Sequence, residues 1–384
     1  MALFIVCLLL AAFFVTVHAG LMIGLILEWR RDRNALSKSQ PGEPRFPRVS
    51  VVIPFRNEKE RMRPLLESLA AQEYPELEFI FIDDRSSDGG GDLLRDFEKK
   101  VPAIPVTLIR LEENPGINRK QYALARGIEA ADGELFLFTD ADCTVPPGWV
   151  SAMAARMRNH GTGITIGPVF KKAQGRGFFQ LYQCFDHAVR YMYLAASTGL
   201  GAAGGGFGNN LILRREALEA VGGYDAVPPS PTEDASLIAQ IRARSRYKVR
   251  AACGSDVHVM TQGERTWRNF VSQTLRWNNG GLFSPDFSTR LNFGYLMAAI
   301  SLGILCIVPA LFVPWVWLLP AGVYISMTMN TIAVLALFRV SLPRAGLAYI
   351  FQLIFTPMYF TFLTILGVFG VKARWKGADL SCPD

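Results

Sequence analysis

The hydrophobic and polar positions of this 384-residue chain follow two contrasting patterns. Residues 2–27, 291–338 and 345–371 contain no Asp, Glu, Lys or Arg, whereas the middle of the chain alternates short apolar runs with polar segments. A bilayer core of roughly 30 Å requires about 20 apolar residues in a helix. We therefore expect one membrane-spanning helix in the first stretch, two in the second, broken near Pro314–Pro320, and one in the third.

The N-terminal apolar stretch has the features of a retained membrane anchor. Val17-His18-Ala19 resembles a signal-peptide cleavage site, but no basic region precedes the apolar run, and the run resumes with LMIGLIL. The following residues, EWRRDRNALSK, are rich in arginine, and by the positive-inside rule such a flank lies in the cytoplasm. We expect a transmembrane helix over 1–28 and a basic juxtamembrane linker over 29–48. The chain is then an integral protein of the bacterial inner membrane with a cytoplasmic polar domain.

The side of the membrane on which the C-terminal tail lies is left open by the sequence. Residues 291–371 have room for about three transmembrane or re-entrant helices, and three crossings would place the tail, 372–384, outside the cytoplasm. The tail nevertheless begins KARWKG and is basic. Either one segment is re-entrant or interfacial, or the positive-inside rule fails locally.

The polar middle of the chain has the pattern of an α/β domain, which we place at 49–262. The expected strands are 49–55, 76–84, 106–112 and 135–142, and the expected helices are 59–72, 92–100 and 119–131. Short buried strands that alternate with helices are typical of a mostly parallel sheet covered on both faces. Ligands of such sheets bind beyond the carboxyl ends of the strands.

Three of the expected strands end in polar residues, which would lie along one edge of a parallel sheet. They lead to Pro54-Phe55-Arg56-Asn57-Glu58, to Asp83-Asp84 and to Asp140-Ala141-Asp142. An Asp-x-Asp sequence alone is weak evidence, because an aspartate can simply cap the following turn. At a strand end, however, clustered carboxylates suit a hard divalent cation that also holds the phosphates of a substrate. We therefore expect a hard divalent cation at Asp140 and Asp142.

Two later segments add candidate site residues to this domain. The run GLGAAGGGFGNN (199–210) precedes a strand-then-helix pattern, which favours a tight loop at the site over a flexible linker. In SPTEDASLIAQIRARS (230–245), Thr232 can cap a helix that has Glu233 and Asp234 in its first turn, where acidic residues are favoured anyway. The functional alternative is that an acid here acts as a general base.

An amphipathic segment, 263–290, lies directly before the C-terminal apolar stretches. Within it Gln273 is three and four residues from Arg276 and Trp277, so that it shares a helical face with both. Trp277 could anchor the helix at the bilayer interface. Alternatively, it offers a stacking surface beside an arginine that binds phosphate.

The composition of the chain argues against some kinds of site and partner and indicates no new site. The arginine-rich flank accounts for part of the net charge of +7, so that no nucleic-acid partner is needed to explain the charge. The six cysteines show no paired spacing, and the four histidines are scattered, which argues against a disulfide framework or a zinc site.

The order of the short sequence blocks resembles that of the membrane-bound family 2 glycosyltransferases, which include cellulose, hyaluronan and ceramide-glucosyltransferase-like enzymes. The blocks are VSVVIPFRNE, FIDDRSSDGG, NRKQYALARGI, FTDADC, GGGFGNN with GGYD, TED and QTLRW. The resemblance covers residues 49–277 and the flanking spans. It implies a GT-A fold, a Rossmann-like nucleotide-sugar-binding domain, flanked by transmembrane helices. It also implies inverting transfer from a donor that is usually UDP-linked, with Mg²⁺ or Mn²⁺.

The resemblance assigns roles to residues by position. Four would surround the nucleoside of the donor: Pro54, Arg56, Glu58 and Asp84. Lys120 would lie near the diphosphate, Asp140 and Ala141 would face the donor, and Asp142 would hold the metal. The acceptor and diphosphate side would comprise Gly206, Phe207, Gln273, Arg276 and Trp277. The catalytic residues would be Asp234 and Glu233, of which Asp234 corresponds to the base that deprotonates the acceptor hydroxyl. Arg119 departs from the pattern, since the family usually has glycine before the lysine.

The expected function is therefore transfer of a sugar from a UDP-sugar to a membrane lipid. The spans are few and uncharged, a poor lining for a hydrated sugar polymer, although a small processive polysaccharide synthase stays an alternative. A transporter is a remote alternative, because carriers place ionisable residues inside their spans. A nucleotidyltransferase could share the aspartates but needs neither TED nor QTLRW. The sugar, the lipid and the oligomeric state stay open.

Overall fold

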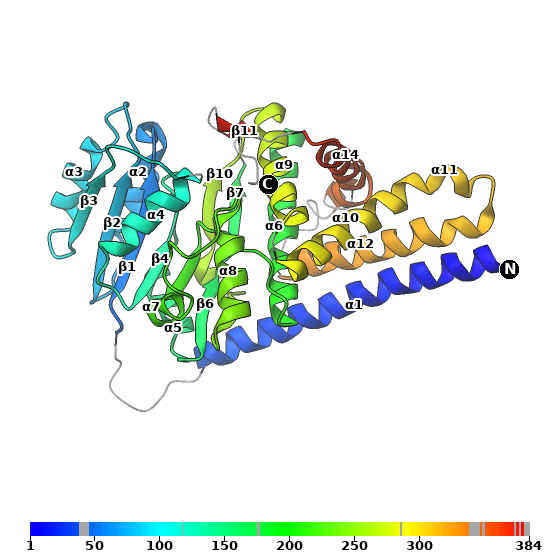
Figure 1. Ribbon diagram of the computed structural model, residues 1–384, viewed down its shortest axis with the longest axis horizontal. Coiled ribbons are helices and arrows are strands. Elements are labelled where there is room, and N and C mark those ends of the chain that lie inside the picture. Colours follow the sequence, from blue (N-terminus) through cyan, green and yellow to red (C-terminus); the bar gives the residue numbers. More distant parts are fainter. Residues whose placement is uncertain are drawn as a thin grey trace. The chain divides into compact units, whose positions relative to one another are not determined.

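The computed structural model describes residues 1–37, 46–116, 118–173, 175, 177–284, 286–337, 346–347 and 350–371, with the backbone of 374–375 and 378–379. The chain divides into two compact units. The helical unit comprises Met1–Leu27, Gly175–Gly204 and Glu264–Asp384, and the sheet unit comprises Glu28–Gln174 and Gly205–Gly263. The chain therefore enters the sheet unit at Glu28, leaves it after Gln174, returns at Gly205 and leaves it again after Gly263 (Figure 1).

The sheet unit is built on a seven-stranded sheet in the order β3-β2-β1-β4-β8-β6-β9 within the described residues. Its strands are β1 (Val49–Phe55), β2 (Leu77–Asp83), β3 (Val106–Arg110), β4 (Leu135–Phe138), β6 (Thr162–Ile166), β8 (Leu211–Arg214) and β9 (Lys248–Ala251). The four expected strands, β1 to β4, pair in parallel, as the sequence predicts. β8 reverses the direction, because it runs antiparallel to both β4 and β6. The sheet is thus mixed.

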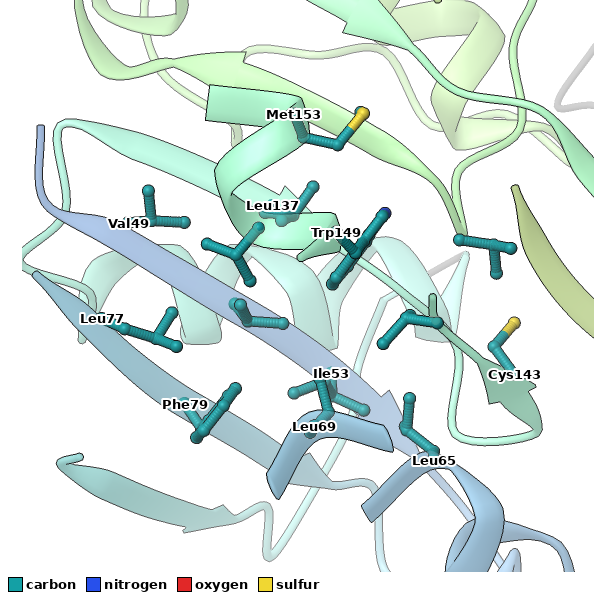
Figure 2. Packing of buried hydrophobic residues seen from close by; sticks show 14 of the residues in the cluster. Val49, Ile53, Leu65, Leu69, Leu77, Phe79, Leu137, Cys143, Trp149 and Met153 are labelled. Atoms are coloured by element: carbon teal, nitrogen blue, oxygen red, sulfur yellow. The ribbon is translucent and has the colours of Figure 1, made fainter. Parts of the chain in front are cut away.

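Helices cover both faces of the parallel half of the sheet, which explains its uninterrupted apolar strands. The helices of the sheet unit are α2 (Lys59–Ala70), α3 (Asp92–Lys100), α4 (Arg119–Glu129), α5 (Trp149–Arg156), α7 (Arg215–Glu219) and α8 (Glu233–Arg244). Figure 2 shows Val49 and Ile53 of β1 among Leu65 and Leu69 of α2 and Trp149 of α5. The other face packs on α4.

Glycine at one position of α4 allows this packing. A Cβ atom at Gly127 would lie 2.6 Å from Ile82 Cδ1 and 2.8 Å from Val52 Cγ1, closer than carbon atoms can approach. Val52 and Ile82 alternate along their strands with the residues that face α2 and α5. Any side chain at position 127 would therefore push α4 away from the sheet.

The fourth predicted strand, 135–142, is shorter than expected. β4 ends at Phe138, and the amide of Cys143 donates to the carbonyl of Asp140 at 3.1 Å, which closes a turn. A small three-stranded sheet then begins, formed by β5 (Cys143–Thr144), β10 (Val259–Gln262) and β7 (Val169–Lys172). Asp140 and Asp142 consequently lie in a turn beyond the strand.

The N-terminal helix α1 (Ala2–Ser37) is longer than the predicted span. Residues 29–37, assigned from sequence to the juxtamembrane linker, continue this helix, and residues 38–45 lie outside the described part. Glu28 and Asp32 lie one helical turn apart and accept hydrogen bonds from the amides of Ala251 and Cys253, at 2.9 and 2.8 Å. The end of α1 thereby caps the outermost strand, β9, whose backbone would otherwise be an open sheet edge.

An ion-pair cluster holds the end of α1 in the sheet unit. Arg156, at the end of α5, donates from Nε to Asp32 Oδ1 at 2.7 Å and from Nη1 to Asp256 Oδ2 at 2.8 Å. The side chain of Arg156 is 2% exposed and that of Asp32 is 4% exposed. Burying charged side chains this completely costs folding free energy unless every charge is paired. The helix end is thus an integral part of the sheet unit.

The helical unit contains α6 (Phe178–Gly199), α9 (Trp267–Leu282), α10 (Phe287–Leu305), α11 (Ile307–Ala310), the short 3₁₀ helix η2 (Pro314–Trp317), α12 (Leu318–Leu337), the π-helical turn η3 (Phe351–Phe355) and α14 (Thr356–Val368). Of the described residues, three segments are long and apolar enough to cross a membrane: Ala2–Ser37, Pro314–Leu337 and Phe351–Val368. The predicted break near Pro314 is confirmed by η2. α10, predicted as the first C-terminal span, is not among the three.

Candidate active site

The carboxyl ends of β1, β2 and β4 bring most of the predicted donor-side residues together in the sheet unit. The register pairs Phe55, the last residue of β1, with Asp83, the last residue of β2, and Val52 with Phe138 at the end of β4. The loops that follow these strands therefore leave the sheet at one edge. This confirms the expected convergence of the three polar strand ends.

The loops after β1 and β2 are tied to each other. The amide of Asn57 donates to Ser86 Oγ at 3.0 Å, and the amide of Ser87 donates to Asn57 Oδ1 at 2.9 Å. Asn57 adopts a left-handed conformation with φ of 54°, which asparagine tolerates better than most residues. The loops contain three of the four predicted nucleoside residues, Arg56, Glu58 and Asp84, and Pro54 is in β1 itself.

Asp142 is partly buried and lies near other acidic side chains. Arg61, from α2, forms an ion pair with Asp142 and a second one with Glu58 at 3.5 Å. Burial raises the pKa of Asp142 to about 6; Asp140 and Glu58 add to this effect, and Arg61 and Lys120 oppose it. A carboxylate in such a place is stabilised by a nearby cation.

Lys120 connects the two acidic sequences of the site. Its ammonium group lies 2.7 Å from Asp140 Oδ1 and 3.2 Å from Glu233 Oε1. Burial alone would lower the pKa of Lys120, but Asp140 and Glu233 together hold this pKa above its ordinary value. The lysine therefore stays charged, and its ammonium group links the turn after β4 to the start of α8.

Asp234 has a different set of partners from Glu233. Its Oδ2 accepts from the amide of Gly208 at 2.8 Å, and its Oδ1 accepts from the amide of Ala235 at 2.8 Å. Burial and the neighbouring Glu233 raise the pKa of Asp234 to about 6, although Lys120 and the two amides oppose the rise. Thr232 occupies the N-cap position as predicted, without a capping hydrogen bond from its side chain.

The glycine-rich sequence forms a tight loop before β8, as predicted. The amide of Asn210 donates to the carbonyl of Phe207 at 2.9 Å, which closes the turn that also presents Gly208 to Asp234. Gly206 lies in the same loop, and Phe207 packs against the core between α2 and the sheet. The side chain of Ala141, between the two aspartates of the Asp-x-Asp turn, also lies in this core.

The structure adds two residues that the sequence analysis did not select. Asn118 accepts from the amides of Lys120 and Gln121 at 3.0 and 3.1 Å, and so caps α4. Its amide group donates to the carbonyl of Ser230 at 2.6 Å and to Glu233 at 3.4 Å. Asparagine before a helical run is a recognisable N-cap signal, but its second partner is 112 residues away. Arg61, the partner of Asp142, carries no such local signal.

Gln273, Arg276 and Trp277 lie on α9, which belongs to the helical unit. The amide group of Gln273 donates to Glu264 Oε1 at 3.0 Å. Gln183 of α6 also holds Glu264, since it donates to its carbonyl at 3.0 Å and accepts from its amide at 2.7 Å. Residues Glu264 and Gln183 thus fix the start of α9 against α6.

Comparison with known proteins shows the family of this chain. It matches glycosyl transferase family 21 over residues 9–383, nearly its whole length. The chain belongs to this family. It is a glycosyltransferase, as the resemblance of its sequence blocks predicts, and the finer assignment to particular family 2 members stays a prediction.

Curated relatives of this family 21 chain are distant. It is 25% identical over 277 residues to "Probable glycosyltransferase YdaM" of Bacillus subtilis, which covers 69% of this chain and 63% of the relative. It is 24% identical over 239 residues to the beta-monoglucosyldiacylglycerol synthase of Trichormus variabilis, covering 62% of this chain and 49% of the relative. In each case the match spans less than two thirds of the relative's own length.

A solved structure confirms the fold. The mannosyltransferase PcManGT of Pyrobaculum calidifontis, determined in complex with GDP-Man and Mn²⁺, superposes with a TM-score of 0.53 at 20% identity, covering 94% of this chain and 100% of that one. The sheet unit of this family 21 glycosyltransferase therefore has the predicted GT-A-like fold.

Proposed function

We propose that this glycosyltransferase moves a sugar from a UDP-linked donor to a membrane lipid, with inversion, and that Asp234 is the general base. The environment of Asp234 carries the proposal. Its carboxylate is half-buried in the sheet unit, has a pKa of about 6 and is held by the amide of Gly208. Such a group is mostly ionised at neutral pH and can still accept a proton from a hydroxyl.

The two acids of the TED sequence have separate roles in this proposal. Glu233 is engaged with Lys120 and Asn118, so we assign it to the positioning of these two residues. The hydrogen bonds to Asp234 come from backbone amides, which orient its carboxylate without neutralising it. A group that must take up a proton benefits from this arrangement, because a full counter-charge would lower its basicity.

The donor occupies the edge formed by the loops after β1, β2 and β4. Arg56, Glu58 and Asp84 in these loops, with Pro54, are assigned to the nucleoside, as in the family that the sequence resembles. Lys120 is assigned to the diphosphate, because its ammonium group is positively charged and lies beside Asp140. Pairing with two acids keeps Lys120 at this edge.

The carboxylates of this edge fit a divalent cation. Within the described residues no three His, Cys, Asp or Glu side chains group as a complete metal site. Mg²⁺ is commonly bound through one or two carboxylates together with the phosphates of the substrate, and Asp140 and Asp142 supply that number. When bound, Mg²⁺ or Mn²⁺ neutralises charge on the departing UDP. The structural relative PcManGT was determined with Mn²⁺.

Two observations support a lipid acceptor. Relatives in Trichormus variabilis and Nostoc are named beta-monoglucosyldiacylglycerol synthases. The helix that carries QTLRW, α9, is followed directly by the apolar helices of the chain. A relative in Staphylococcus epidermidis is named poly-beta-1,6-N-acetyl-D-glucosamine synthase, 27% identical over 61% of this chain, which keeps polymer synthesis as the second candidate.

We also propose that the sheet unit faces the cytoplasm. The arginine-rich end of α1 follows the positive-inside rule. Because only two candidate spans follow the sheet unit in the described residues, the basic sequence KARWKG that begins at residue 372 returns to the cytoplasmic side. α10 is then an interfacial or re-entrant helix, one of the two alternatives that the sequence leaves open.

The test compares Asp234→Asn with Asp225→Asn in membranes supplied with radiolabelled UDP-sugars. Asp225 is an exposed aspartate whose side chain pairs with Arg126. We expect Asp234→Asn to lose transfer by about 10²–10⁴-fold, the usual size of a general-base contribution, while binding of UDP is retained. Asp225→Asn should act as the wild type does.

The location of the label identifies the acceptor. One discrete labelled species in the organic extract supports a glycolipid, whereas a water-soluble ladder identifies a small processive synthase. If Asp234→Asn weakens UDP binding and leaves the turnover number unchanged, Asp234 is a capping residue and the base is elsewhere.

A further inference from the structure

A buried ion pair in the helical unit has no role in the proposed chemistry. Arg190 Nε donates to Asp186 Oδ2 at 2.7 Å, one turn apart on α6, and their side chains are 12% and 4% exposed. A buried pair of this kind is often no more stabilising than apolar residues of the same volume. Stability alone therefore does not explain why this ion pair is buried between apolar helices.

The ion pair lies directly against Trp277 of the QTLRW sequence. The guanidinium carbon of Arg190 is 5.3 Å from the centre of the Trp277 ring and 5.1 Å from that of Phe360 on α14. The ring of His187 stacks on Trp277 at 5.4 Å with an interplanar angle of 25°. Arginine suits this position because its planar cation stacks on aromatic faces while it binds a carboxylate.

The contacts between α6 and α9 follow one face of α6. Residues 183, 186, 187 and 190 are spaced as neighbours on one side of a helix. Gln183 holds Glu264, which in turn binds Gln273, and His187 and Arg190 hold Trp277. This face of α6 thus contacts Trp277 directly and Gln273 through Glu264, two of the three site residues assigned to α9.

We propose that Asp186 and Arg190 are positioning residues that fix the indole of Trp277 for the lipid acceptor, an inference that rests on the proposed function of the QTLRW sequence. Asp186 binds the guanidinium group, and the guanidinium group and the ring of His187 both pack against the indole. Trp277 itself is only half-buried, so part of its ring is available to a ligand. Arg190 need not touch the donor or the reacting atoms.

The experiment uses the full-length protein in detergent micelles and the double variant Asp186→Leu with Arg190→Met. Removing both charges leaves no unpaired buried ion, so that the fold should tolerate the change. Tyr193→Phe is the matched control: Tyr193 lies on α6 as well, but its hydroxyl bonds to His18 and Asn330. Arg190→Lys keeps the charge and loses the planar stacking.

The first readout does not require catalysis. Oxidation of each tryptophan by N-bromosuccinimide is followed by mass spectrometry, with Trp149 of the sheet unit as internal reference. We expect Trp277 to react several-fold faster in the double variant, at an intermediate rate in Arg190→Lys and at the wild-type rate in Tyr193→Phe. Unchanged reactivity of Trp277 in the double variant overturns the inference, whatever the protein catalyses. Faster reaction of Trp149 as well would show general loosening and would also overturn it.

The second readout separates acceptor binding from chemistry. With an extract of host membrane lipids as acceptor, the KM for lipid should rise roughly 30-fold in the double variant, the size of a desolvated cation–π contact, while the KM for the UDP-sugar is unchanged. Hydrolysis of the donor by water should also be unchanged. Equal loss of donor and acceptor affinity counts against the inference. Failure of the wild type to label any lipid refutes the proposed acceptor instead.

Discussion

Replacement of Asp32 by alanine tests whether the end of α1 stabilises the sheet unit. Arg156, 2% exposed, would keep Asp256 as its partner, but the side chain of Asp256 is 43% exposed and so offers a weaker pair. Removing one partner from a buried ion pair costs about 3–5 kcal/mol, which the remaining Asp256 reduces to about 2 kcal/mol. The amide of Cys253 also loses its acceptor, at a cost of about 1–2 kcal/mol. We expect a total of about 3–4 kcal/mol.

The loss can be measured in the full-length protein in two ways. For a unit of this size, about 3–4 kcal/mol corresponds to a fall in Tm of about 10 °C. Hydrogen exchange should accelerate first in the peptide that contains β9 and Cys253, because this edge loses its cover. The matched control is Asp92→Ala. Asp92 pairs with Arg95 at 3.7 Å with both side chains largely exposed, a pair of little energetic value.

A clear result would refute the reasoning. If Asp32→Ala and Asp92→Ala melt within about 1 °C of each other, the buried cluster contributes no more than a surface ion pair. Equal exchange rates at β9 in the variant and the wild type would show that the helix end does not protect the edge strand.

Three further predictions concern the base, the metal and the packing of α1. Because the base must be ionised and the pKa of Asp234 is about 6, kcat/KM should be flat above pH 6 to 7 and fall about ten-fold per pH unit below it; an unchanged rate at pH 5 would exclude this assignment. Asp142→Asn should abolish transfer in a folded protein, as should EDTA in the wild type, since an amide cannot replace an anionic ligand; full activity in EDTA would sink the metal role. Gly24→Ala should lower Tm, because its Cβ would meet Leu200 Cγ at 2.7 Å, whereas Gly20→Ala, with nothing within 4 Å, should not; equal melting of the two would contradict the close contact.

Much of the parallel half of the sheet could be predicted because its signals are local. The expected strand at 49–55 is β1 residue for residue, since its apolar run ends sharply at Arg56. The edge position of Asp84, Asp140 and Asp142 followed from strand direction alone. The reversed direction of β8 could not be predicted, because four apolar residues carry no information about which strands they will pair with.

The links across the candidate site required the tertiary structure. Lys120 and Glu233 are far apart in sequence, and their ion pair exists only because α4 and α8 begin at the same place in the sheet unit. Arg61 could not be selected from sequence, since a charged residue on an amphipathic helix usually faces solvent. The continuation of α1 to Ser37 was missed for another reason: arginines after an apolar run indicate membrane orientation, not the end of a helix.

The path of the chain through the sheet unit sets the order in which this protein can fold during synthesis. β4 and β6 are made before the chain departs at Gly175, but they do not pair with each other, because β8 lies between them. β8 leaves the ribosome only after the whole of α6. Until then the nascent chain carries two sheet edges that await the same strand, and such edges readily pair with other chains. An N-terminal fragment that ends before residue 205 lacks β8 and would present these two edges permanently.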